Sequence, residues 1–122
     1  RAADACEKVS RVRPEWLAAY KQQLLAHARR ASEQEIKWHL AQMLPRLPLT
    51  ARQKASAVTL LKRFWDDPSR IVRVSALQAL ADFSAGDRRL RNELSAILAR
   101  LKNDTAPSVQ ARARKLLREA PC

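Results

Sequence analysis

The side chains that could do chemistry in this chain are few and lie far apart in the sequence. His27 and His39 fall in two different predicted helices, and neither is accompanied by a Cys or Ser nucleophile in a recognisable setting. Cys6 and Cys122 lie near opposite ends, where they would form either a terminal disulfide or, as we expect, two free thiols in a reducing cytoplasm. Neither cysteine has a histidine at ligand spacing, so we predict no metal site, no cofactor and no enzymatic activity.

Positive charge is the most pronounced property of the sequence. Its 122 residues include 24 Lys and Arg against 12 Asp and Glu, which gives a net charge of +12. This balance favours an anionic partner such as nucleic acid, anionic lipid or an acidic protein surface, but a solvated arginine-rich surface would give the same count. The charge alone therefore leaves the partner open.

The composition is typical of a helical protein. Hydrophobic residues make up 47% of the chain, Ala and Leu dominate them, and the single glycine is Gly86. No apolar run approaches the roughly 20 residues that span a bilayer, so we expect a soluble, cytoplasmic protein that makes no membrane contact. Periodicity and turn residues predict helices at residues 2–11, 14–29, 33–44, 51–65, 68–83, 88–102 and 108–119.

Several helix ends carry their own sequence signals. Asp67 precedes Pro68, which suits a first helical position, so we expect Asp67 to cap the helix that follows. Ser32 and Glu35 have the spacing of a capping box at the start of another helix. The remaining signals are a helix-ending glycine and two further capping residues, Gly86, Thr50 and Asp87.

One apolar pattern recurs along the chain. Val72, Ala76 and Leu80 mark a helical stripe, and equivalent residues lie 36 positions earlier and 37 positions later. The equivalent residues are Ile36, Leu40 and Leu44, then Val109, Ala113 and Leu117, with Ala5 and Val9 at the same spacing nearer the start. Paired helices at a fixed period predict an α-solenoid of antiparallel neighbours. We expect one repeat domain over residues 1–122, in units of about 1–30, 31–66, 67–103 and 104–122.

These stretches resemble HEAT repeats, whose second helix follows an Asp-containing turn and carries Val-Arg, Ala and Leu at helical spacing. Asp67–Leu80 is the best match, Asp104–Leu117 has Gln110 in the arginine place, and Ile36–Leu44 lacks the turn aspartate. The alternative, a tetratricopeptide array, has a shorter period of about 34 residues and needs a glycine that is absent here. The resemblance implies an all-α, α-α superhelix (a HEAT-like solenoid) of about seven antiparallel helices.

The resemblance also implies roles for particular residues. The turn aspartate of one HEAT unit commonly pairs with the arginine of a neighbour, which implies a structural ladder of Asp67, Arg73 and Asp104. Second helices of such solenoids line a concave surface, where Trp38 is either a contact residue or packed at an edge between units. The implied partner-binding residues are Trp38, His39, Gln42, Val74, Gln78, Arg112 and Lys115.

By this resemblance we expect a non-catalytic HEAT-like scaffold that binds a protein partner through its concave, second-helix surface. The alternative is nucleic-acid binding through the phosphate backbone. Arg114 and Arg118 share a helix face, which would either follow phosphates or serve as the polar end of the solenoid. A leading helix without its mate also predicts a homodimer through the N-terminal flank.

Overall fold

The computed structural model describes residues 2–119, and over this range the chain is all-helical, without a strand. This confirms the predicted all-α class and its seven α-helices, to which the structure adds two short 3₁₀ helices. None of these helices combines the length and apolar character needed to cross a membrane. The elements are α1 (Ala2–Val12), η1 (Pro14–Tyr20), α2 (Lys21–Arg30), α3 (Gln34–Met43), η2 (Leu44–Arg46), α4 (Ala51–Phe64), α5 (Arg70–Phe83), α6 (Arg88–Leu101) and α7 (Pro107–Glu119).

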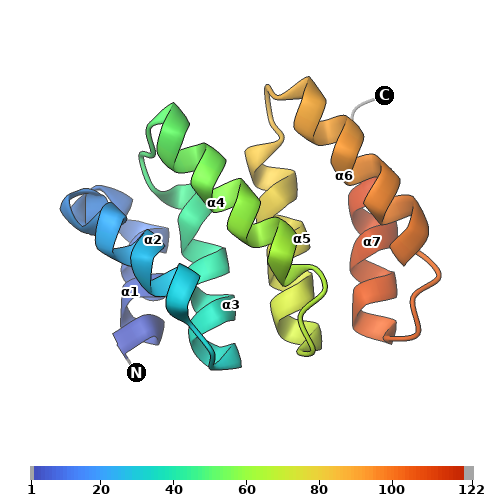
Figure 1. Cartoon of the computed structure of the whole chain (residues 1–122), viewed down its shortest axis with the longest axis horizontal. Coiled ribbons are helices and arrows are strands. Elements are labelled where there is room, and N and C mark those ends of the chain that lie inside the picture. Colours follow the sequence, from blue (N-terminus) through green and yellow to red (C-terminus); the bar gives the residue numbers. More distant parts are fainter. Residues whose placement is uncertain (1, 120–122) are drawn as a thin grey trace.

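The helices are arranged in two layers (Figure 1). In one layer α1, α3, α5 and α7 lie side by side, and each packs against the next. In the other layer α2 packs on α3 and α4, α4 packs on α5, and α6 packs on α5 and α7. Helix α5 therefore has a neighbour on either side within its own layer and further neighbours in the second layer.

The repeated apolar stripe forms the centre of the core. Val72, Ala76 and Leu80 of α5 are fully buried, as are Val109 and Ala113 of α7. Burying a Val or Leu side chain contributes about 1.5–3 kcal/mol, so a stripe of this kind is sufficient to hold each helix against its neighbours. At the same spacing Val9, Ile36 and Leu117 are only partly buried and Ala5 is exposed, so the periodicity marks the buried face fully in α5 and less completely in the other helices of the first layer.

Two predicted helix caps and the predicted glycine turn are confirmed. Thr50 Oγ1 accepts a hydrogen bond from the Gln53 amide at 3.2 Å, and the Gln53 side chain accepts one from the Thr50 amide at 3.0 Å. Asp87 Oδ1 accepts from the Leu90 amide at 3.1 Å and caps α6. Gly86 has a φ of 76°, a conformation that glycine adopts without steric cost.

The predicted cap of α5 is wrong by two residues. The helix begins at Arg70 rather than at Pro68, and Ser69 caps it by accepting a hydrogen bond from the Val72 amide at 3.4 Å. Asp67 instead closes the preceding turn, where its Oδ1 accepts from the Ser69 amide at 2.9 Å. A side chain reaches only the amides two or three positions ahead, so Asp67 lies too early to cap this helix.

The predicted capping box at Ser32 and Glu35 is also wrong. Helix α3 begins at Gln34 and has Glu33 at its cap position, without a side-chain hydrogen bond there. This shift of one residue places Glu35 at the second helical position, from which it cannot make the reciprocal bond of a capping box. The predicted helix over 14–29 likewise opens as the 3₁₀ helix η1 and becomes α-helical only from Lys21.

Candidate functional site

A groove of about 510 Å³ lies on the layer formed by α1, α3, α5 and α7. We call it the α5 groove, because Ile71, Val74, Gln78 and Asp82 line it along one face of α5. Residues of α1, α3, η2 and α7 complete its walls. Four of the seven residues expected to contact a partner line this groove together, namely Gln42, Val74, Gln78 and Arg112.

Part of the lining of the α5 groove is apolar. Ile71 is 43% exposed, although it is a large hydrophobic residue, and Val74 is only partly buried against the core. A second hollow, of about 590 Å³, shares both residues and extends past Ser69 and Arg70 to the start of α5. The two hollows adjoin at Ile71 and Val74, and their lining residues together extend along α5 from its first turn to Asp82.

The other part of the lining is a chain of polar groups. Arg112 Nη1 donates a hydrogen bond to Gln78 Oε1 at 2.6 Å, and Gln78 Nε2 donates to Asp82 Oδ1 at 3.1 Å. The Gln78 amide therefore links α7 to the last turns of α5 and is held in one orientation. The polar half of the groove therefore consists of hydrogen-bonded side chains, Arg112, Gln78 and Asp82, that hold one another in place.

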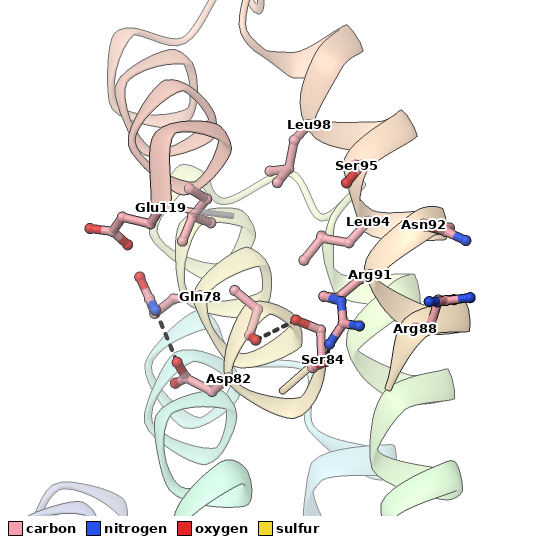
Figure 2. A pocket seen from close by; sticks show the side chains of 12 residues that line it. Gln78, Asp82, Ser84, Arg88, Arg91, Asn92, Leu94, Ser95, Leu98 and Glu119 are labelled. Atoms are coloured by element: carbon pink, nitrogen blue, oxygen red, sulfur yellow. Dashed lines mark hydrogen bonds between the residues drawn. The ribbon is translucent and has the colours of Figure 1, made fainter. Parts of the chain in front are cut away.

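A third hollow lies on the opposite side of Gln78 and Asp82, between α5, α6 and α7 (Figure 2). It measures about 460 Å³, and Arg88 and Arg91 of α6 line it. Arg91 Nη1 donates to the carbonyl oxygen of Ser84 at 3.3 Å. Because Gln78 and Asp82 line both this hollow and the α5 groove, these two residues connect the depressions.

An ion-pair network around one buried carboxylate borders the α5 groove. Glu7 of α1 is only 2% exposed, and Arg46 Nη1 donates to its Oε2 at 2.6 Å and to Ser10 Oγ at 3.0 Å. Arg11 Nε donates to Glu7 Oε2 at 2.6 Å, and Arg11 Nη2 pairs with Oε1. The hydrogen bonds from Arg11, supported by Arg46, lower the pKa of Glu7 from 4.5 to about 2 against the opposing effect of burial.

Asp4, Glu7 and His39 form a cluster of metal-ligating types in residues 2–119. Their potential ligand atoms all lie within 4.8 Å of one another, and His39 Nδ1 is buried without a hydrogen-bond partner in this range. However, both carboxylate oxygens of Glu7 already accept hydrogen bonds from guanidinium groups. A cation there would have to displace or approach two positive charges, so the geometry favours a salt bridge over a metal centre.

His39 occupies a different place from the one expected. It is only 3% exposed, its Nε2 lies 4.0 Å from Asp4 Oδ1, and its ring stacks on Trp38 with centroids 3.7 Å apart. The predicted exposure on a concave face is wrong for His39, because α1 and α5 pack on both sides of α3 and bury more of that helix than its apolar stripe indicates. Trp38 is partly buried and packs against the core.

The remaining basic residues of the prediction lie on α7. Lys115 is exposed, its Nζ lies 4.0 Å from Glu119 Oε1, and it does not line the α5 groove. Arg114 and Arg118 are exposed and make no ion pair with any carboxylate in residues 2–119. These two guanidinium groups are therefore available to an anion.

The expected ladder forms in part: Arg73 bridges to Asp104, but Asp67 pairs with Lys37, which was not predicted. Arg73 Nη2 donates to Asp104 Oδ1 at 2.9 Å, Arg73 Nε donates to the Trp65 carbonyl at 3.0 Å, and the pair lowers the pKa of Asp104. Asp67 is not bound by Arg73, since its partner is Lys37, with Nζ 2.6 Å from Oδ2. Lys37 occupies the place in α3 that Arg73 occupies in α5. The two contacts are therefore equivalent: each joins a helix of the first layer to the turn before the next helix of that layer.

Ile71, Arg11 and Arg46 line the groove but were not among the residues predicted from the sequence. Ile71 had a usable signal, because it lies three and seven positions before Val74 and Gln78 and thus shares their helix face. Arg11 and Arg46 had none, because they reach the groove only through the packing of α1 and η2 beside α3 and α5.

The N-terminal elements expose three large hydrophobic residues. Val12, Trp16 and Tyr20 are 72%, 65% and 58% exposed. Cys6 is a half-buried free thiol, whereas Cys122 lies outside the described residues. The homodimer through this flank stays a prediction.

Comparisons with known proteins leave the family open. No protein-family model matches the chain, and neither a curated protein nor a solved structure matches it. What can be concluded about function therefore depends on the geometry of the α5 groove and of the charges around it.

Proposed function

We propose that the chain is a non-catalytic, HEAT-like solenoid scaffold that binds a segment of a protein partner in the α5 groove. The side-by-side packing of α1, α3, α5 and α7 supports the solenoid. The recurring apolar stripe and the two equivalent bridges, Lys37–Asp67 and Arg73–Asp104, support a repeat of about 36 residues.

The observation that carries the binding proposal is the pair of adjoining hollows along α5, with the exposed side chain of Ile71 lining both. A partly exposed apolar residue among fixed polar groups is typical of a protein interface, where apolar anchors supply affinity and polar groups supply orientation. From Ile71 to Asp82 the groove follows twelve residues of α5, a rise of about 16 Å, which is enough for three turns of a partner helix.

A direct test uses Ile71→Ala with Val12→Ala as its matched control. Both wild-type residues are exposed β-branched side chains, but only Ile71 lies in the groove. Partners would be identified by affinity capture, purified and titrated calorimetrically. We expect Ile71→Ala to weaken binding about tenfold, the effect of losing one apolar anchor, and Val12→Ala to change it less than twofold. Equal affinity of both variants and the wild type would rule out the α5 groove as the binding site.

A second candidate function is binding of the nucleic-acid backbone. It is favoured by Arg114 and Arg118, which are exposed, lie one helical turn apart and make no ion pair in residues 2–119. The test is a tryptophan-fluorescence titration with mixed-sequence DNA at several salt concentrations. If the surface binds phosphates, log K falls with log salt with a slope of about −0.9 per phosphate contact. The double variant Arg114→Gln/Arg118→Gln removes about two contacts, so its slope should be less steep by the contribution of two contacts. Absence of binding at low salt would exclude this function.

A further inference from the structure

We infer that the α5 groove accepts an acidic segment that carries an apolar side chain between two carboxylate-bearing positions. This inference rests on the proposed function and adds the chemistry of the partner to it. It follows from three properties of the same surface: its unbalanced charge, its apolar centre and the spacing of its guanidinium groups.

The charge of the groove is unbalanced. Arg11 and Arg46 share the single carboxylate of Glu7, so that cluster keeps one net positive charge. Arg112 donates to the neutral amide of Gln78 rather than to a carboxylate. Asp82 is the other carboxylate among the lining residues, and it accepts from the same amide.

Arg70 adds another positive charge at the opposite end. It lines the hollow that continues the groove past Ile71, and it makes no ion pair with a carboxylate in residues 2–119. The two adjoining hollows are therefore lined by four guanidinium groups and two carboxylates. A partner that supplies carboxylates would neutralise the excess positive charge through directional, charge-assisted hydrogen bonds.

The spacing of the groups sets the pattern expected in the partner. Arg70 is eight residues before Gln78, which Arg112 contacts, so the points of α5 that carry the two charges lie about 12 Å apart along its axis. Ile71 and Val74 lie between them. A partner would thus present carboxylates about eight residues apart if helical, or about four apart if extended, with an apolar side chain between them.

The apolar centre distinguishes this site from one for nucleic acid. A phosphate backbone would satisfy the guanidinium groups but would leave Ile71 and Val74 facing a charged, hydrated strand. An acidic protein segment suits both the charged and the apolar part of the groove. Its apolar side chain would cover Ile71 and Val74, and its carboxylates would pair with the arginines.

The experiment is a selection of random displayed peptides of about 16 residues against the immobilised chain in about 0.15 M salt. The same selection is run on Ile71→Ala and Arg112→Gln, and on the control variants Val12→Ala and Arg63→Gln, which change exposed residues outside the groove. Circular dichroism melts verify that each variant is folded. Selected peptides are then titrated individually, with a DNA duplex as competitor.

We expect the wild type to enrich net-negative peptides with an apolar residue flanked by Asp or Glu. Ile71→Ala and Arg112→Gln should each lower the affinity for these peptides about tenfold, and the control variants should leave that affinity unchanged within twofold. Enrichment of neutral or basic peptides that still depend on Ile71 would overturn the acidic preference and leave the proposed function standing.

Two other outcomes would overturn both proposals. Acidic peptides that bind every variant equally would show attraction to the overall positive charge rather than to the groove. Failure to enrich any peptide, with binding of the DNA duplex alone, would assign the basic surface to nucleic acid.

Discussion

At the scale of single residues, Glu7 is a buried carboxylate bound by two arginines. Its carboxylate is removed from water yet remains charged, because Arg11 and Arg46 approach it from α1 and η2. Such a pair stabilises the fold only while both charges are present, since a buried unpaired charge is costly. The same two arginines border the α5 groove, so this carboxylate also holds two of its positive charges in place.

The Glu7 pair predicts an acid-sensitive stability. The pKa of Glu7 falls from 4.5 in the unfolded chain to about 2 in the folded one, so its contribution is complete above pH 4.5. As the pH falls from 4.5 towards 2, the unfolded state takes up the proton first and the free energy of unfolding decreases. We expect Glu7→Gln to cost about 2–3 kcal/mol at pH 7 and to flatten this part of the profile in urea titrations.

A matched control for that measurement is Glu93→Gln. Glu93 pairs with Lys62 at the surface, where its side chain is 42% exposed, and removing such a pair should change stability by less than about 1 kcal/mol. An equal loss in both variants, or an unchanged pH profile in Glu7→Gln, would contradict the role given to the buried carboxylate.

At the scale of the helices, local hydrogen bonds decide where each element begins. Thr50, Ser69 and Asp87 each bond to an amide three positions ahead, and the helices start immediately after them. Ser32 has the same type of side chain and a suitable residue three positions later, yet α3 starts beyond it. The difference shows that a capping pattern works only where the backbone places the side chain directly at the helix start.

This difference gives a paired prediction for two hydroxyl residues. Thr50→Ala removes one half of a capping box and should lower the free energy of unfolding by about 1 kcal/mol. Ser32→Ala removes an exposed hydroxyl outside any cap and should change it by less than about 0.5 kcal/mol. Chemical denaturation of both variants checks the prediction, and a larger effect at Ser32 would mean that α3 is capped there in solution.

At the scale of the whole molecule, α5 is the helix with the most neighbours. It packs against α3, α4, α6 and α7, whereas α7 packs against α5 and α6. The same helix supplies Ile71, Val74, Gln78 and Asp82 to the α5 groove. Packing on its other sides therefore gives the groove a rigid wall, which limits the entropy lost when a partner is bound.

The central place of α5 predicts unequal costs for the same substitution in two helices. Leu77 of α5 is fully buried, and Leu116 of α7 is 5% exposed. We expect Leu77→Ala to cost about 4 kcal/mol and Leu116→Ala about 2 kcal/mol, because α7 has fewer neighbours and is freer to close the cavity. Thermal and urea unfolding measure both losses; a greater loss at Leu116 would contradict this account of the core.

Much of the fold was predictable from the sequence because it depends on neighbours close in the chain. Helix formation, the caps at Thr50 and Asp87, and the turn at Gly86 follow from interactions over a few residues. The stripe of Val72, Ala76 and Leu80 was equally readable, since burial of one helix face leaves a periodic signal. The sequence by itself therefore determined the helical class, the element order and most of the core.

The tertiary structure decided which side chains meet. Burial of His39 depends on α1 and α5 lying on either side of α3, and Arg46, the second arginine that binds Glu7, lies 39 residues away from it. The α5 groove likewise combines Gln78 with Arg112 from another helix, 34 residues later. Such contacts leave no periodic trace, because they depend on how whole helices pack and not on the preferences of any one segment.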